Sequence, residues 1–283
     1  MNEKEINQIK RYLALQLERY VLLIKEEYRE FILSHTLNFL NNVTNYEELI
    51  KIEDTGTITC FVNNGKIYFP ILAYKILNIL KKIPGFGLKQ THKTYNDDTL
   101  VINDNTFNTY IAHVFIAGLS LKAFYDEMML HEAMHLCGMA GSNAFQEGLT
   151  EFKTRELAKK YNLKTSACGY PKEVKIVYRL QEIFGSDFMN KLAFDMSSSD
   201  RFMIIFDKLG KDGVDFFNEI ISLMEKEFQI KYYQHTKSFN GLIAPIKKAK
   251  MYDEIDYTEV YKVIDAYCSS HKVTNEEVIS KMN

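Results

Sequence analysis

The chain has 283 residues, of which 46% are hydrophobic and 25% charged, a balance typical of a globular protein with a buried core. The net charge of −2 argues against a nucleic-acid binder held by bulk electrostatics, and no apolar run is long enough to span a membrane. The N-terminus lacks the apolar segment of a secretory signal, and the four cysteines form no CxxC pair. We therefore expect a cytoplasmic protein, with export by another route left open.

The first 55 residues are predicted to be helical. Apolar side chains recur in steps of three and four from Ile6 to Phe31, which predicts one long helix over residues 4–42 that packs on the core. A helix that dimerises or binds a partner is the alternative. Thr44 and Glu47 have the spacing of a capping box, which predicts a short helix through residue 52.

The next segment is predicted to be the β region of the protein. Asn64 and Gly65 stand between two β-rich runs, which predicts a hairpin that ends at Pro70. A helix over residues 71–82 is expected to follow. Two strands, TLVIND and TYIAHVFIAG, are then expected within residues 99–118.

The rest of the chain is predicted to be helical. Ser120 can cap a helix that runs to about Cys137, with Gly138 after it, and Ser142 can cap a second helix through about Tyr161. Further helices are expected over residues 171–184, 187–196, 200–209, 213–234, 256–270 and 275–282. The order of elements predicts a predominantly helical α+β protein with a small N-terminal sheet, folded as one compact unit.

The stretch LHEAMHLCGMAG, residues 130–141, carries two histidines four positions apart. Positions i and i+4 share one face of a helix, so the imidazoles of His131 and His135 can bind one metal ion, while Glu132 projects beside it and can take a proton from bound water. Such a motif arises by chance in a chain of this composition with a probability of roughly 1%. The alternative is a structural histidine pair bonded to Glu132 or Glu127. That arrangement is costly on an apolar helix without a partner, and zinc is the expected partner.

A catalytic zinc site needs a third protein ligand. The segment QEGLTE places Glu147 and Glu151 one turn apart on the second predicted helix, so either carboxylate can be that ligand. The short connection over residues 138–141 lets the two helices fold back on each other. Gly148 is expected to let the second helix approach the first closely.

An HExxH helix followed by a helix with an E-G-x-x-E motif resembles the gluzincin metallopeptidases, the thermolysin-like and aminopeptidase-like zincins. The resemblance covers about residues 120–160. It implies a zincin-like catalytic core with one Zn²⁺ per chain, Glu147 as the third ligand and Glu151 as the acceptor for a zinc-bound histidine N–H. The chain is shorter than these families between His135 and Glu147, and it lacks the GxMEN-type motif of the aminopeptidases, so exopeptidase activity is not implied.

With this resemblance the chain is expected to have three parts. Residues 1–55 form a helical segment packed on the core, residues 56–141 a zincin-like sheet with the active-site helix, and residues 142–283 a helical lobe that carries the third ligand. The implied activity is an endopeptidase that hydrolyses a peptide or protein substrate, with Glu132 as general base for a zinc-activated water. The alternatives are a zinc-binding regulator with the same fold that cleaves its protein partner rarely or not at all, and a vestigial site.

The oxyanion of such a reaction is expected to need a donor besides zinc. In the related families this donor is a tyrosine or histidine after the third ligand, and Tyr170, in CGYP before a predicted helix, is the first candidate. Other candidates are Tyr178, Tyr232, Tyr233 and His235. The strand over residues 107–117 is expected to hold an extended substrate. Arg155 and Arg179 are candidates to bind a substrate carboxylate, with charges on solvated helix faces as the alternative. Cys137 is predicted to point away from the metal.

Overall fold

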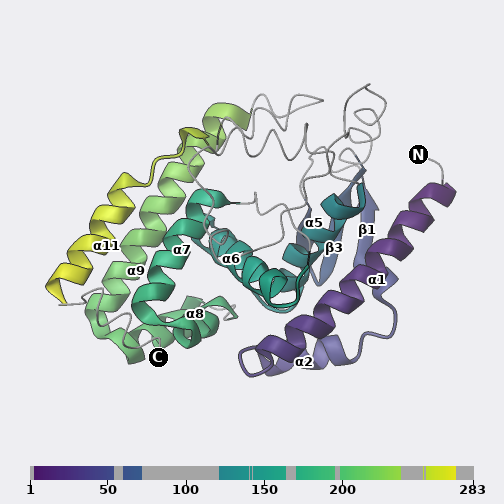
Figure 1. Ribbon diagram of the computed structural model, residues 1–283, viewed down its shortest axis with the longest axis horizontal. Helices are drawn as coiled ribbons and strands as arrows, with labels where there is room; N and C mark the ends of the chain where they lie inside the picture. The colour runs from purple at the N-terminus through teal and green to yellow at the C-terminus, as the bar shows by residue number, and fades with distance from the viewer. Residues whose placement is uncertain are drawn as a thin grey trace.

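The computed structural model describes residues 3–53, 60–71, 121–139, 141, 143–163, 170–194, 198–236, 251 and 253–271. Within these ranges the protein is mainly helical with a small three-stranded sheet, which confirms the expected α+β class (Figure 1). The helix expected over residues 71–82, the two strands expected within residues 99–118 and the helix expected over residues 275–282 lie outside the described residues, apart from residue 71, where a helix begins.

The N-terminal region forms two helices, so the prediction of one helix over residues 4–42 was wrong. Helix α1 spans Glu3–Tyr28 and helix α2 spans Ser34–Asn41. Leu33, which precedes α2, has extended backbone angles (φ −60°, ψ 143°) that a continuous helix excludes. Phe31 and Ile32, at the break between the two helices, still contact the core. The apolar periodicity therefore continues through the break, and it gives no sign of the turn.

The predicted helix after residue 44 is a short 3-10 turn that leads into a strand. The turn, η1, spans Tyr46–Leu49, and the Asn45 side chain, rather than Thr44, accepts a hydrogen bond from the backbone N–H of Glu47. Strand β1 (Ile50–Glu53) follows at once and pairs in parallel with β3. Because this pairing joins segments distant in sequence, local capping signals could not predict it.

The predicted hairpin is confirmed. Strands β2 (Phe61–Asn63) and β3 (Lys66–Pro70) are antiparallel, and Asn64 and Gly65 both have positive φ, as a two-residue hairpin turn requires. The strand order is β1-β3-β2. Ile50 and Ile67 are partners in the parallel pair, and both are fully buried.

The remaining described elements are helices, as predicted. They are α5 (Leu121–Leu136), α6 (Ala144–Lys160), α7 (Pro171–Phe184), α8 (Ser186–Ala193), α9 (Ser198–Thr236) and α11 (Thr258–Ser270). Gly210 interrupts α9 with non-helical angles, close to the boundary that the sequence predicted between two helices. In Figure 1 the elements follow one another across the molecule, from α1 at the right, past α5 and α6, to α9 and α11 at the left.

Helix α6 lies in the middle of this arrangement, with α5 on one side and α7 on the other. Its position explains why polar side chains such as Lys153 and Arg155 are fully buried on it. Gly148 does allow a close approach, but to α7 and not, as expected, to α5. A Cβ added at Gly148 would lie only 2.5 Å from the Cβ of Glu173, so the glycine lets α7 sit directly against α6.

Glu173 is fully buried at this contact, which leads to a pH-dependent prediction. Burial raises the pKa of Glu173 from 4.5 to about 7, although Tyr257 and Arg155 favour the ionised form. Because the pKa is raised in the folded state, the stability linked to the bound proton is full below pH 4.5 and is lost as the pH rises through about 7. Glu173→Gln removes this titration.

We therefore expect metal-free Glu173→Gln to gain stability relative to the wild type as the pH rises, by up to about 3 kcal/mol above pH 7. Urea unfolding of both proteins between about pH 5 and about pH 8 measures the difference in the free energy of unfolding. Parallel pH profiles for the two proteins would contradict the assignment.

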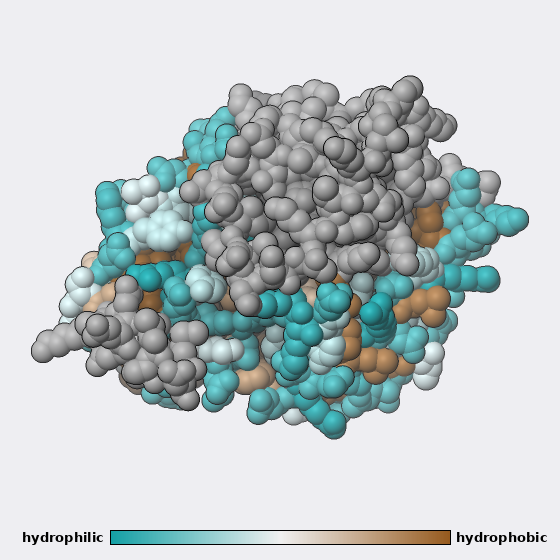
Figure 2. Space-filling view, viewed as in Figure 1, coloured by the Kyte–Doolittle hydropathy of each residue, from teal (hydrophilic) through white to brown (hydrophobic). Residues whose placement is uncertain are grey.

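Eleven large hydrophobic side chains are exposed among the described residues, and six of them lie on α9. Among the coloured residues of the face in Figure 2, hydrophilic ones predominate and hydrophobic ones form small separate groups. The exposed hydrophobic side chains of α9 include Phe202, Met203 and Phe206, and the rings of Phe202 and Phe206 stack 5.8 Å apart. None of the helices in the described part of the chain combines the length and apolar character that a membrane span requires.

Candidate metal centre

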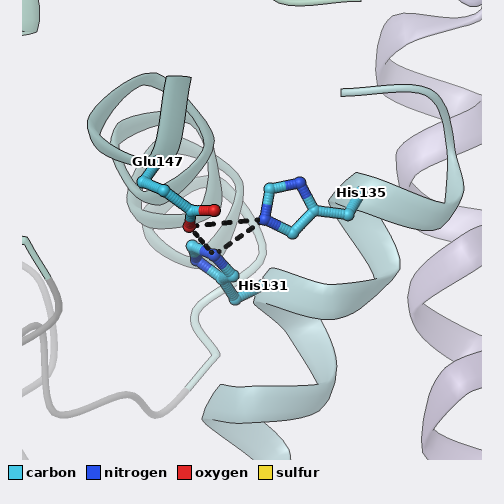
Figure 3. Close-up of side chains that lie close together, drawn as sticks. All are labelled: His131, His135 and Glu147. Carbon is cyan, nitrogen blue, oxygen red and sulfur yellow. Dashed lines mark hydrogen bonds and ion pairs between the residues drawn. The ribbon is translucent and has the colours of Figure 1, made fainter. Parts of the chain in front are cut away.

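The two histidines of the HExxH motif and Glu147 face one another across the α5–α6 contact (Figure 3). The Nε2 atoms of His131 and His135 lie 3.1 Å apart. Glu147 Oε2 lies 3.3 Å from the first of these atoms and 3.6 Å from the second. Among the described residues, these three side chains form the only group of histidine, cysteine and acidic residues close enough to hold one metal ion.

The distances within this group fit a tetrahedral zinc ion. Ligands at about 2.0–2.1 Å from a tetrahedral ion lie about 3.3–3.4 Å from one another. The three measured separations of 3.1, 3.3 and 3.6 Å bracket that value. The two nitrogens and the carboxylate oxygen therefore form a triangle of the size that zinc requires, and the same set leaves a fourth position for water or substrate.

The outer nitrogens of both imidazoles have oxygen partners. His135 Nδ1 lies 3.0 Å from the carbonyl oxygen of Met139, and His131 Nδ1 lies 3.0 Å from Glu151 Oε2. A carbonyl can only accept, so His135 Nδ1 carries the proton and its Nε2 is free to bind a metal. An ionised Glu151 imposes the same tautomer on His131. Such oxygen partners are the usual orienting contacts of histidine ligands.

The two glutamates of α6 thus occupy different positions. Glu147 faces both Nε2 atoms, whereas Glu151 contacts the outer nitrogen of His131 and receives a 2.9 Å hydrogen bond from Nε of Arg155. Arg155 is completely buried and holds Glu151. It therefore does not bind a substrate carboxylate, which was one of the two interpretations of its sequence position. Burial raises the pKa of Glu151, but the charges of Arg155 and His131 outweigh burial and lower it.

Charged side chains gather around His131 in the metal-free site. Burial lowers the pKa of His131, but hydrogen bonds to Glu147 and Glu151 outweigh it and raise the pKa to about 10. Burial raises the pKa of Glu147, but hydrogen bonds to His131 and His135 outweigh it and hold the pKa well below its ordinary value. Two ionised carboxylates therefore surround His131, and they favour a cation at this point. A metal ion and the His131 proton compete for the same place.

The connection between α5 and α6 is built around the site. Gly138 has a φ of 110°, and Asn143, rather than the expected Ser142, caps α6 by accepting from the N–H of Gln146. Glu225 of α9 accepts from the N–H of Ala144 at 2.9 Å, a contact that fixes the first turn of α6 and that the sequence did not signal. These contacts hold the turn from which Glu147 projects.

Gly141 is the tightest point of this connection. A Cβ there would lie 2.3 Å from His135 Cε1 and 2.8 Å from Glu147 Oε1, distances that force one ligand to move. We expect Gly141→Ala to lower zinc affinity by about 10–100-fold, the range seen when ligand orientation is disturbed. Chelator competition measures the affinity. Gly185→Ala is compared with it, because a Cβ at Gly185 meets nothing within 4 Å and the φ of 88° there adds only backbone strain away from the site. Equal zinc affinity of Gly141→Ala and wild type would contradict the prediction.

Glu132 lies on α5 next to the first ligand and is 6% exposed. Burial and, to a smaller extent, the charge of Glu132 raise the pKa of Cys60, the residue that immediately precedes β2. Cys60 is therefore a neighbour of the expected general base. Sequence reasoning missed it because the sheet brings it there from 72 positions upstream.

Tyr170 is the oxyanion candidate that the structure places beside the metal ligands. Its ring stacks on that of His131, with centroids 5.9 Å apart and an angle of 18°. The other candidates differ. Tyr178 packs its ring against Phe152, and Tyr232 and Tyr233 are exposed on α9, while the side chain of His235 lies outside the described residues.

Two further sequence expectations have simple outcomes. Arg179 lies 3.8 Å from Glu182 on the surface of α7, as a solvated pair would. Cys137 is fully buried, burial raises the pKa of its thiol, and it is not part of the group of possible ligands.

Comparison of the chain with protein-family models, with curated proteins and with solved structures finds no match. The chemical interpretation of the site therefore depends on its own geometry.

Proposed function

We propose that this protein is a zinc-dependent metallopeptidase with a zincin-like core, which hydrolyses peptide bonds with Glu132 as general base. The observation that carries the proposal is the triangle of His131 Nε2, His135 Nε2 and Glu147 Oε2. Glu132 follows His131 directly on α5. The three side chains of the triangle would hold one Zn²⁺ per chain. Bound zinc supplies a Lewis acid that polarises a carbonyl and lowers the pKa of water.

The residues around the triangle have separate tasks in this reaction. Glu132 takes the proton of the attacking water and later returns it to the leaving amine. Glu151 and the Met139 carbonyl hold the imidazoles in the orientation in which both Nε2 atoms face Glu147. Tyr170, whose ring lies on His131, is the donor that we assign to the oxyanion.

The position of Glu132 supports a peptidase over a zinc-binding regulator. A regulator that only binds a partner needs the three ligands but no base beside them. An ionisable side chain that is 6% exposed costs free energy, so its place next to the ligands favours a catalytic role. The substrate in this proposal is a peptide or protein, and the location is the cytoplasm.

The test is metal-dependent turnover. The protein is stripped with a chelator, reloaded with Zn²⁺ and assayed on a mixed peptide library by mass spectrometry, with the metal content measured on the same sample. We expect one zinc per chain, cleavage within peptide sequences only in the loaded sample, and loss of cleavage when the chelator returns. One zinc without cleavage would support the regulator, and no bound zinc would overturn both functions.

A further inference from the structure

The first turn of α7 lies directly on the metal centre. Tyr170, immediately before the helix, stacks on the ligand His131. Glu173, on the same turn, packs against Gly148, the residue next to the ligand Glu147. The start of α7 therefore contacts the ligand His131 of α5 and the residue next to the ligand Glu147 of α6. A shift of this turn would move both ligands.

The backbone of this turn does not hold its conformation unaided. Tyr170 has a φ of 44° and a ψ of 49°, which lie in the left-handed region that residues other than glycine rarely adopt. No side chain caps the helix there. Strained residues of this kind persist where surrounding contacts fix them, and they cluster at active sites.

Those contacts come from a segment more than 80 residues downstream. The Lys172 side chain donates to the backbone carbonyls of Asp253, at 2.8 Å, and of Ile255. The Tyr257 hydroxyl donates to Glu173 Oε1 at 2.6 Å, and Tyr257 is 4% exposed at the start of α11. Two neighbouring side chains of α7 are thus tied to residues 253–257.

We propose that Tyr257 and Glu173 are positioning residues of the metal centre: their buried hydrogen bond ties the C-terminal segment to the first turn of α7, and this tie holds Tyr170 against His131 and α7 against Gly148. The inference rests on the proposed zinc site. It also means that the region around α11 controls a site whose ligands lie more than 100 positions away in sequence.

The chemistry of the tie supports this role. A contact that served packing alone would be more stable as two hydrocarbon side chains, because burying a carboxyl is costly. Burial raises the pKa of Glu173 to about 7, so the protein keeps an unfavourable group at this place. The charge of Arg155, which holds Glu151, also acts on Glu173, so the tie and the orientation of His131 share one cation.

The experiment replaces the hydroxyl of Tyr257 and reads the metal site directly. Tyr257→Phe is compared with wild type and with Tyr261→Phe, the same change at a more exposed tyrosine of α11. Each protein is loaded with Co²⁺, whose visible absorption reports ligand geometry, and its Zn²⁺ affinity is measured by chelator competition. Glu173→Ala and Glu173→Gln are added because Gln keeps an acceptor for Tyr257 and Ala does not.

We expect Tyr257→Phe and Glu173→Ala to change the Co²⁺ spectrum and to weaken zinc binding by about 10-fold, the lower end for residues that orient ligands. We also expect a lower kcat with little change in KM. Tyr261→Phe should match wild type, and Glu173→Gln should lose less than Glu173→Ala. A lower melting temperature of Tyr257→Phe with an unchanged Co²⁺ spectrum and zinc affinity would overturn the inference, since the tie would then only stabilise the fold.

These readouts separate this inference from the proposed function. If the wild type binds zinc without cleaving peptides, and Tyr257→Phe still alters the Co²⁺ spectrum, the peptidase proposal fails and the tie stands. If the wild type cleaves peptides and Tyr257→Phe matches it in spectrum, affinity and kcat, the tie fails and the peptidase stands.

Discussion

Glu147→Gln is expected to weaken zinc binding by more than about 100-fold, beyond the 10–100-fold typical of residues that only orient a ligand. The reason is the position of Glu147 Oε2, which faces the Nε2 atoms of both histidines at 3.3 and 3.6 Å. An amide has the same shape as the carboxylate but carries no charge, so the triangle would keep its size and lose its anion. Chelator competition at one pH measures the loss.

The matched control is the same substitution one helical turn away. Glu151→Gln keeps an oxygen that can accept from His131 Nδ1, so we expect zinc affinity to fall by about 10–100-fold and no further. Glu151→Gln should also lower the melting temperature more than Glu147→Gln does, because it leaves the buried charge of Arg155 without its carboxylate. If Glu151→Gln loses more zinc affinity than Glu147→Gln, Glu151 is the ligand and the assigned roles are exchanged.

Local spacing predicted the centre of the site but not the choice between its two glutamates. His131, Glu132 and His135 follow from positions i, i+1 and i+4 on one helix, and the glycines after them predict a tight turn. Glu147 and Glu151 also lie on one face of a helix, so spacing alone leaves both as ligand candidates. Their separation into two positions depends on the register of α6 against α5, which the connection through Gly141 and the Glu225 contact sets.

The parts of the fold that the sequence did not predict depend on contacts between distant segments. Strand β1 forms because Ile50 pairs with Ile67 across the sheet, against a local signal for helix. Gly148 is a point of close approach, but its partner is Glu173 of α7 and not the expected helix α5, because spacing does not identify a partner. Tyr257 belongs to no motif, and its hydrogen bond to Glu173 connects it with the site.

Glu132→Gln is expected to lower kcat for peptide cleavage by about 10²–10⁴-fold, the contribution of a general base, with little change in zinc affinity. Glu132 is not part of the triangle, so its substitution leaves the three possible ligands in place. The amide keeps the size of the buried side chain, so the fold should be retained. Kinetics on one peptide from the library, with zinc content measured on the same sample, gives both quantities.

The outcome of this substitution shows whether Glu132 or another group takes the proton of the attacking water. If Glu132 is the base, Glu132→Gln holds one zinc and has a low kcat. If Glu132→Gln cleaves as fast as wild type while holding one zinc, the water loses its proton to another group and the mechanism is wrong.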